Sequence, residues 1–370
     1  MQFYIIFFLI FVILSFLEIF TKKTHKIKSK LVFGISAIFV FLSTFYYGSM
    51  GDYFSYSQYF SDSVSYKNLY TIDLNRFEYL YEFVQVLAYY IIDDYRFLRL
   101  ILAVIVMKIF YSIYIKGDNG EINQYPFTMI LILWSLKFGN IFIIRSTIAS
   151  AICIYSVRYI KKSKFNEFFL CTVIAALFHR MCLLWVCAYF LYSARWIRKY
   201  IYMGIAFGYI FSQYLPRFLS DFSIIFGSKI HQRVSGYMIK GTQLTYGLKY
   251  DTTFMLFKAS INGFFLLIVF GILLQLKRND KDKIIMNGEY TIYLFGFMLQ
   301  VWTLMCSSAV ARVAAPFIGM QYYLLPRIFN VKYDGLFSKM FVFIVFVVYL
   351  FLRMLVSANS AEYIPFVIKF

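Results

Sequence analysis

Charged side chains are scarce in this sequence, and acidic ones are the scarcest. Only 15% of the 370 residues are charged, and 18 Asp and Glu stand against 37 Lys and Arg. A soluble domain usually carries about 25% charged residues, so the deficit excludes an ordinary soluble fold. No Pro-, Gly- or Ser-rich linker and no fixed-period repeat divides the chain. We therefore expect one integral membrane domain over residues 1–370.

Cysteine is also rare, which limits metal and redox chemistry. The five cysteines lie inside apolar segments without paired ligand spacing: Cys153, Cys171, Cys182, Cys187 and Cys306. We expect them to pack as small apolar side chains. The sequence also has no carboxylate cluster of the kind that a magnesium site needs. It therefore predicts no metal site and no cofactor.

Apolar side chains, by contrast, are abundant. Hydrophobic residues make up 61% of the chain, and long apolar runs cover residues 31–48, 99–115, 254–276 and 340–352. A membrane helix needs roughly 17 to 25 apolar residues, and in lipid only helices or closed barrels satisfy the backbone. Because the runs lack the alternation of barrel strands, they predict an all-α, polytopic membrane protein of about twelve transmembrane helices.

The formal net charge of +19 lies mostly in short clusters between these runs. Basic loops of membrane proteins lie in the cytoplasm, so we place the clusters there rather than in a nucleic-acid site: 22–30, 158–164, 195–199 and 277–283. The intervening segments then face outward. They predict an external loop with an interfacial helix over 49–96, and a large external loop over 216–252.

A histidine and an arginine interrupt the apolar stretch between residues 165 and 194. As one helix this stretch would be about 45 Å long and would carry the next basic cluster outside. Two short helices that meet at His179 and Arg180 avoid both problems. The pair is therefore predicted to lie at an external turn.

This topology places ionisable residues from distant parts of the chain near the external ends of helices: Asp52, Arg145, His179, Arg180 and Arg312. Ionisable groups close to hydrocarbon are costly and tend to line functional cavities, which favours a convergent external site. Other interpretations stay open. Each arginine could snorkel to lipid headgroups, His179 could cap its turn, and Asp52 could cap a helix. Tyr53, Tyr56 and Tyr59 are interpreted mainly as an interfacial aromatic belt.

The order of these features resembles that of the Wzy-type polysaccharide polymerases, in particular their EpsG-like branch. Gly51-Asp52-Tyr53-Phe54-Ser55-Tyr56, followed by Phe60 and then by Glu78, is similar to the acidic, tyrosine-rich first external loop of that family. Asn140-Ile141-Phe142-Ile143-Ile144-Arg145 with Ala149 is similar to its Asn…Arg-Gln…Ala segment, although Ser146 replaces the glutamine.

Two later patterns carry the same resemblance. Ala176-Leu177-Phe178-His179 is similar to the Phe-His turn of the family, although Arg180 is unusual after it. Arg312, before Pro316-Phe317 and Leu325-Pro326, is similar to the late arginine helix. The resemblance spans nearly the whole chain.

The resemblance implies a polymerase of undecaprenyl-pyrophosphate-linked oligosaccharides that acts on the outer face of a bacterial cytoplasmic membrane. Arg145 and Arg312, with Arg180 third, would bind pyrophosphate, and His179 or Asp52 would be the general base. Tyr56 and Glu78 are assigned to sugar binding. Expected partners are the lipid-linked oligosaccharides, membrane lipids and a chain-length regulator, with no nucleic acid.

Three alternative functions remain. A flippase for the same lipid would also have about twelve helices, but this chain shows no two halves of similar pattern. A membrane O-acyltransferase could use a His-Arg pair and would depend on acyl-CoA. A non-catalytic assembly or sensor protein is the third alternative.

Overall fold

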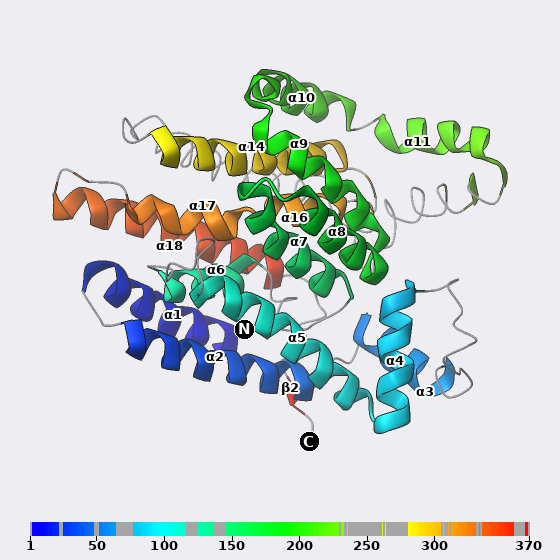
Figure 1. Ribbon diagram of the computed structural model, residues 1–370, viewed down its shortest axis with the longest axis horizontal. Coiled ribbons are helices and arrows are strands. Elements are labelled where there is room, and N and C mark those ends of the chain that lie inside the picture. Colours follow the sequence, from blue (N-terminus) through cyan, green and yellow to red (C-terminus); the bar gives the residue numbers. More distant parts are fainter. Residues whose placement is uncertain are drawn as a thin grey trace. The chain divides into compact units, whose positions relative to one another are not determined.

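In the residues that it describes, the computed structural model consists of helices and one short pair of strands (Figure 1). It describes these residues: 2–21, 25–47, 52–63, 77–115, 125–136, 145–212, 214–228, 231–232, 235, 261, 263, 280–304, 306, 310, 312–330, 333, 335–358 and 367–368. The chain divides into two compact units, residues 1–183 with 329–370 and residues 184–328.

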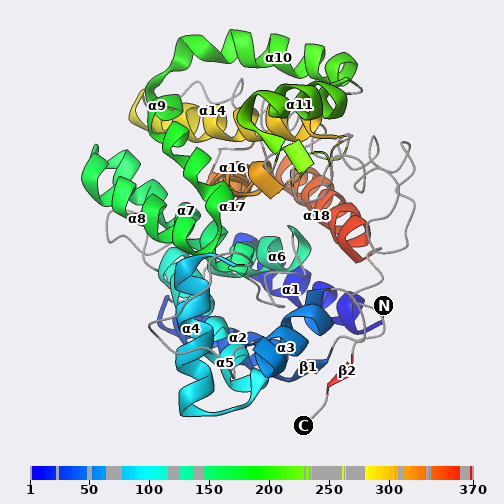
Figure 2. The same ribbon diagram turned by 90° about the vertical axis from the view of Figure 1, so that its right-hand side faces the viewer.

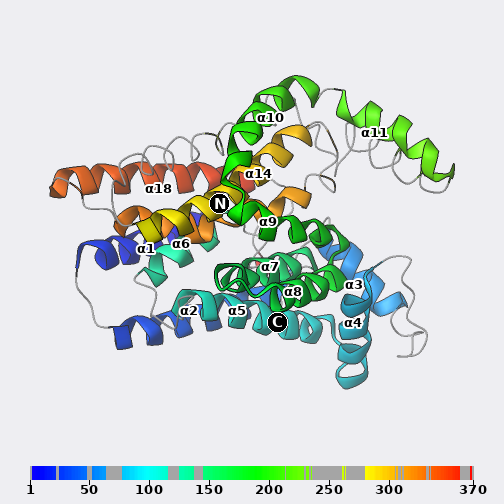
Figure 3. The same ribbon diagram turned by 45° about the horizontal axis from the view of Figure 1, so that its top comes forward.

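The first unit contains most of the long helices. Its elements are α1 (Gln2–Phe20), α2 (His25–Phe45), β1 (Tyr46–Tyr47), α3 (Asp52–Ser63), α4 (Tyr79–Ile91), α5 (Tyr95–Ile115), α6 (Pro126–Leu136), α7 (Arg145–Lys161), α8 (Phe165–Phe178), α18 (Leu336–Ala358) and β2 (Val367–Ile368). Helix α1 packs on α6, and α6 on α18, while α2 lies beside α5 and α7 beside α8 (Figure 3).

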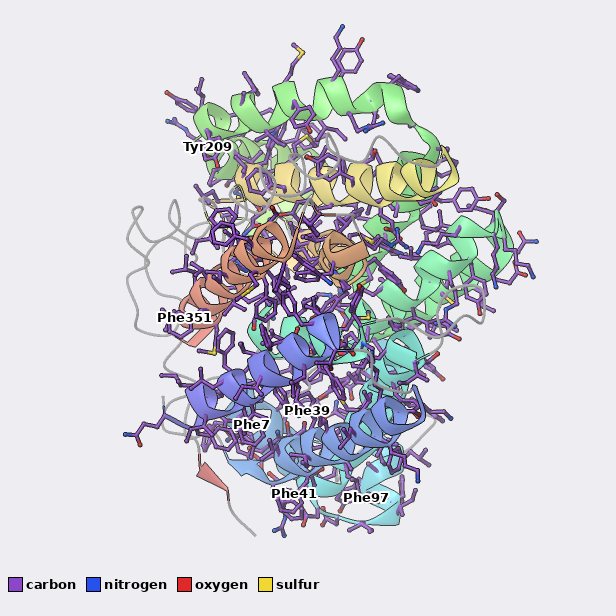
Figure 4. All side chains as sticks on the ribbon, turned by 90° about the vertical axis from the view of Figure 1, so that its left-hand side faces the viewer. Phe7, Phe39, Phe41, Phe97, Tyr209 and Phe351 are labelled. Atoms are coloured by element: carbon purple, nitrogen blue, oxygen red, sulfur yellow. The ribbon has the colours of Figure 1, made fainter. Side chains whose placement is uncertain are left out.

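An aromatic cluster forms the centre of this unit. The indole of Trp134, on α6, stacks on the rings of Phe7 and Phe39 with centroid distances of 5.2 and 5.8 Å. Phe7 comes from α1 and Phe39 from α2, and both are labelled in Figure 4. The Trp134 N–H donates to the Tyr4 carbonyl at 3.2 Å, so the buried indole keeps its polar group satisfied.

A carboxylate from α1 fixes the start of α6. The backbone N–H groups of Phe127 and Thr128 donate to the two oxygens of Glu18 at 3.2 and 2.9 Å. Lys28 lies 3.6 Å from the same carboxylate. The first N–H groups of a helix lack helical partners, so Glu18 supplies from another helix what a local cap usually provides.

The ends of α2 and of the chain are joined by the two strands, which pair antiparallel with Tyr46 opposite Ile368 and Tyr47 opposite Val367 (Figure 2). Arg99 of α5 donates to the Tyr46 carbonyl at 2.5 Å, and its guanidinium lies over the Tyr53 ring at 5.2 Å. These contacts tie α5 to β1 and to the first turn of α3. They therefore position the segment that begins with Asp52.

The second unit contains one long helix, α14 (Asp280–Trp302), and several shorter ones among the residues that the structure describes. Its described elements are the end of η3 (Arg180–Val186), α9 (Cys187–Ser193), η4 (Arg195–Ile197), α10 (Arg198–Phe211), α11 (Leu215–Ser223), η5 (Ile224–Phe226), α14, η6 (Arg312–Ala314), α16 (Ala315–Ile318), α17 (Gln321–Arg327) and the start of η7 (Ile328–Asn330). The Trp302 indole of α14 donates to the Gly204 carbonyl of α10 at 2.8 Å. Gly208 permits this contact, because a Cβ there would lie 2.3 Å from the indole.

Four helices in the described part of the chain are long and apolar enough to cross a membrane: α1, α2 over Lys28–Phe45, α5 and α18 over Leu336–Leu355. The chain is an all-helical, polytopic membrane protein, apart from the two short strands. The expected count of twelve spans stays a prediction, since the run at 254–276 lies almost wholly outside the described residues. The expected external loop at 216–252 starts with helix α11 and is mostly outside them too.

Two details of the sequence interpretation change. Tyr56 and Tyr59 are buried, so the prediction that they belong to an interfacial belt is wrong. They pack on Phe77 with centroid distances of 5.1 and 4.8 Å. Glu82 and Gln85 of α4, within the segment predicted as an interfacial helix, are also fully buried. Tyr59 donates to Glu82 at 2.7 Å, which gives the carboxylate a partner inside the unit.

Labelling of single cysteines tests the predicted topology. In a background without the five native cysteines, Asp62→Cys on α3 and Lys162→Cys after α7 place thiols at exposed positions. On intact cells an impermeant maleimide should modify position 62, which is predicted to be external. Position 162, within a basic cluster, should react only after the membrane is permeabilised. The reverse pattern would overturn the topology.

Candidate functional site

Five of the residues singled out in the sequence lie together in the first unit. Tyr56 comes from α3, Glu78 directly precedes α4, and Arg145 is the first residue of α7. His179 caps the end of α8, and Arg180 follows it. Four separate segments of the chain therefore meet at helix ends, where short connections bring polar side chains together.

Glu78 holds both arginines of this cluster. Its Oε2 accepts from Nη1 of Arg145. Its Oε1 accepts from the backbone N–H of Arg180 at 3.2 Å and from the side-chain Nε of Arg180 at 3.3 Å. One carboxylate thus fixes two guanidinium groups from helix ends that are 35 residues apart in the chain, counting from 145 to 180.

Arg145 is bound on several sides. Its Nε donates to the Tyr56 hydroxyl at 3.0 Å, and its guanidinium lies 4.8 Å from the centre of the Phe77 ring. The Tyr56 ring stacks on Phe77 with an interplanar angle of 8°. The planar guanidinium is therefore oriented by a carboxylate, a hydroxyl and an aromatic face at once, an arrangement that only arginine can make.

The charge of Glu78 is stabilised by its neighbours. Burial raises the pKa of the Glu78 carboxyl, but the charge of Arg145 and the backbone N–H of Arg180 outweigh burial, so that its pKa lies below the ordinary value. A carboxyl whose pKa is lower in the folded than in the unfolded state stabilises the fold at pH values above its unfolded-state pKa. This stabilisation is lost as the pH falls through the lower, folded-state pKa. The carboxylate is therefore ionised at neutral pH.

His179 occupies the break that the sequence predicts after α8. Its backbone is extended, which ends the α-helix at Phe178, and the next segment continues as the 3₁₀ helix η3. The imidazole is buried, and its Nδ1 accepts from the backbone N–H of Met181 at 3.4 Å. A neutral imidazole that accepts at Nδ1 carries its proton at Nε2, so in this arrangement the ring can donate from Nε2.

The two arginines differ in exposure. The Arg180 side chain is 57% exposed, whereas that of Arg145 is 19% exposed. The Arg180 side chain is therefore accessible from outside the cluster, while Arg145 is largely covered and contacts Tyr56, Phe77 and Glu78. The two cations can contact an anionic group from different depths.

Two other residues predicted from the sequence, Asp52 and Arg312, are not among the five residues of this cluster. Asp52 is the first residue of α3, one helical turn before Tyr56, so its backbone lies at the edge of the cluster; its side chain lies outside the described part of the structure. Arg312 is the first residue of η6, in the second unit. The cluster described here thus consists of first-unit residues.

Sequence reasoning missed two supporting residues. Arg99 is buried on α5 and links β1 to α3, and Phe77 lies beneath the Arg145 guanidinium. An arginine at the start of a long apolar run was a usable signal for Arg99, because a buried arginine must find acceptors. Phe77 carried no such signal. Among the described residues, no group of three or more His, Cys, Asp or Glu side chains is arranged to hold a metal ion.

Comparison with known proteins gives one match. A family model with the description "EpsG family" matches residues 30–367, which is nearly the whole chain. No curated protein and no solved structure matches significantly. The match includes every residue of the cluster.

Proposed function

Because this chain belongs to the EpsG family of Wzy-like polysaccharide polymerases, we propose that it polymerises undecaprenyl-pyrophosphate-linked oligosaccharide repeat units. The reaction takes place at the outer face of a bacterial cytoplasmic membrane. A growing glycan leaves its lipid carrier and is joined to the non-reducing-end hydroxyl of another lipid-linked unit. The observation that supports this proposal best is the pair of arginines held by one carboxylate beside a histidine.

The arginines suit the leaving group of this reaction. The bond between the anomeric carbon and a phosphate oxygen breaks, and the pyrophosphate departs with the electron pair, so its negative charge grows in the transition state. Guanidinium groups fixed in advance stabilise that growing charge more than they stabilise the ground state. Arg180 is the exposed contact, and Arg145 provides the second positive charge. Arg312, in the second unit, stays a pyrophosphate-binding prediction from the sequence alone.

Glu78 then acts as a positioning residue. Both of its oxygens are engaged by arginines, so the geometry favours arginine orientation over sugar binding for this side chain. Tyr56 likewise has its hydroxyl on Arg145 and supports the same guanidinium. The two guanidiniums supply the charge that a metal ion provides at other phosphate sites, so the proposed reaction is metal-independent.

The acceptor hydroxyl must lose its proton while its oxygen forms a bond to the anomeric carbon. His179 and Asp52 are the two candidates for the base. Since Nδ1 accepts from Met181, we propose that His179 donates from Nε2 to a pyrophosphate oxygen during the reaction. We therefore assign His179 to the leaving group and Asp52 to the acceptor hydroxyl as general base.

Deletion of the protein tests the polymerase function in cells. A strain without it should display surface glycan only one repeat unit long, because transfer of a single unit to its final attachment does not require polymerisation. Electrophoresis of the glycan measures the length. Restored long chains on complementation are the control. Unchanged long chains in the deletion strain would exclude a polymerase, and complete loss of surface glycan would instead indicate a flippase.

A further inference from the structure

A buried hydrogen bond joins α3 to α4 one helical turn from Glu78. The Tyr59 hydroxyl donates to Oε1 of Glu82 at 2.7 Å, and both side chains are buried. The backbone N–H of Glu82 donates to the Glu78 carbonyl at 3.1 Å, so the two carboxylates share one face of this segment. One of them holds the arginines, and the other holds α3. Because a buried carboxyl group without its partner is costly, the Tyr59 contact fixes the spacing of the two helices.

The Phe77 ring connects this hydrogen bond to Arg145. Its centre lies 4.8 Å from the centre of the Tyr59 ring, which meets it edge-on, and 4.8 Å from the guanidinium carbon of Arg145. Tyr56, one turn before Tyr59 on α3, stacks on the same ring and accepts from Nε of Arg145 at 3.0 Å. Closely packed side chains transmit a displacement, since interiors have few voids that could absorb it. A shift of Tyr59 therefore reaches the guanidinium through Phe77 and through Tyr56.

We propose that Glu82 is a positioning residue for the polymerase reaction, because its hydrogen bond to Tyr59 sets the place of the Arg145 guanidinium. This rests on the proposed function. The hydrogen bond keeps α3 at the spacing at which the Tyr56 hydroxyl meets Nε of Arg145. A displacement of about 1 Å in a group that stabilises the transition state can cost about 100-fold in rate. The rate of polymerisation thus depends on a contact outside the reacting groups.

Removal of the Tyr59 hydroxyl tests the hydrogen bond alone, because Tyr59→Phe keeps the ring. Chain extension from purified lipid-linked donor and acceptor, per molecule of membrane-inserted protein, should slow about tenfold, since the guanidinium is no longer held at one place. Glu82→Gln keeps an acceptor oxygen and should retain most of the turnover. Tyr111→Phe is the matched control. It removes a hydroxyl that bonds to Ser29 at 3.0 Å elsewhere in the first unit, so turnover should not change.

Combination with Arg145→Lys separates positioning from stabilisation of the fold. If Tyr59 acts through Arg145, adding Tyr59→Phe to Arg145→Lys should cause no further loss, since the guanidinium that it positions is gone. Independent effects would multiply instead. Multiplied losses, or wild-type turnover in Tyr59→Phe, would overturn the proposal. If the carboxyl left alone prevents insertion, Tyr59→Phe with Glu82→Leu removes both polar groups and takes the place of the single variant in each measurement.

Nuclear magnetic resonance of the arginine side chains tests the positioning without the reaction. In protein with isotopically labelled arginine, the Nε–H signal of Arg145 is identified by its absence from Arg145→Lys. Tyr59→Phe should shift this signal and speed its exchange with water, because the contact of Nε–H with the Tyr56 hydroxyl is loosened. Tyr111→Phe should do neither.

An unchanged Nε–H signal in Tyr59→Phe would contradict the positioning of Arg145 by this hydrogen bond. A shifted signal in a protein that transfers no glycan at all would support the positioning and exclude the polymerase function. The two proposals can therefore fail separately.

Discussion

Replacing Arg145 with lysine is expected to lower the rate of polymerisation on the order of 100-fold, although the positive charge is kept. Arg145 donates to Glu78 and to Tyr56 from two different nitrogens and lies over the Phe77 ring. A lysine has one nitrogen on a flexible stem and can keep only one of these contacts at a time. The rate of chain extension from purified lipid-linked donor and acceptor measures the effect.

Arg96→Lys is the matched control for this prediction. Arg96 is also paired with a carboxylate, Asp94, but the pair is exposed at the start of α5. Exposed ion pairs contribute about 0–1 kcal/mol, so activity and membrane levels should stay at the wild-type level. If Arg145→Lys were as active as Arg96→Lys, a requirement of the reaction for the arginine at position 145 would be excluded.

Single substitutions of His179 and of Asp52 are expected to reduce the turnover by different amounts. Asp52→Asn should reduce turnover about 10²- to 10⁴-fold, which is the usual contribution of a general base. His179→Gln should keep a measurable part of the activity, because the glutamine amide can still donate a hydrogen bond from a position near that of Nε2. His179→Ala should lose this residual activity, because alanine has no side-chain hydrogen-bond donor. Turnover per molecule of membrane-inserted protein is the measurement.

His231→Gln provides the control for the histidine exchange. His231 contacts Ser223 in the second unit at 3.1 Å and has no part in the proposed reaction, so full activity is expected. Loss of all turnover in His179→Gln together with an active Asp52→Asn would reverse the two assignments and make His179 the base. Full activity in both variants would remove both residues from the chemistry.

The long helices could be predicted from apolar runs, but their ends depend on side chains that a run does not show. The run at 99–115 predicts α5, which nevertheless begins earlier, at Tyr95. The cause is local, because the Asp94 carboxylate accepts the backbone N–H of Arg96 at 2.7 Å and caps the first turn. The break at His179 was predicted correctly, since helix length and charge placement together forbid a continuous helix there.

The sequence predicts which residues of the site group together, but it does not predict which hydrogen bonds and ion pairs join them. The predicted topology places Arg145, His179 and Arg180 on one side of the membrane, so charge and helix length alone predict that they group together. The contacts of Glu78 with both arginines do not follow, because a carboxylate before a helix is equally consistent with a solvated position. The burial of Glu82 was missed for the same reason, since its partner, Tyr59, lies 23 residues away in the chain.

The carboxylate of Glu78 gives the ligand-free protein an internal counter-ion. In the proposed reaction, binding of pyrophosphate at Arg180 is an exchange of anions, in which the incoming phosphate oxygens take over donors that Glu78 Oε1 occupies at 3.2 and 3.3 Å. The same carboxylate regains these donors when the product carrier departs. Such competition limits the affinity for both substrate and product. For the proposed polymerase this competition would favour release of the spent carrier, which must leave after each addition.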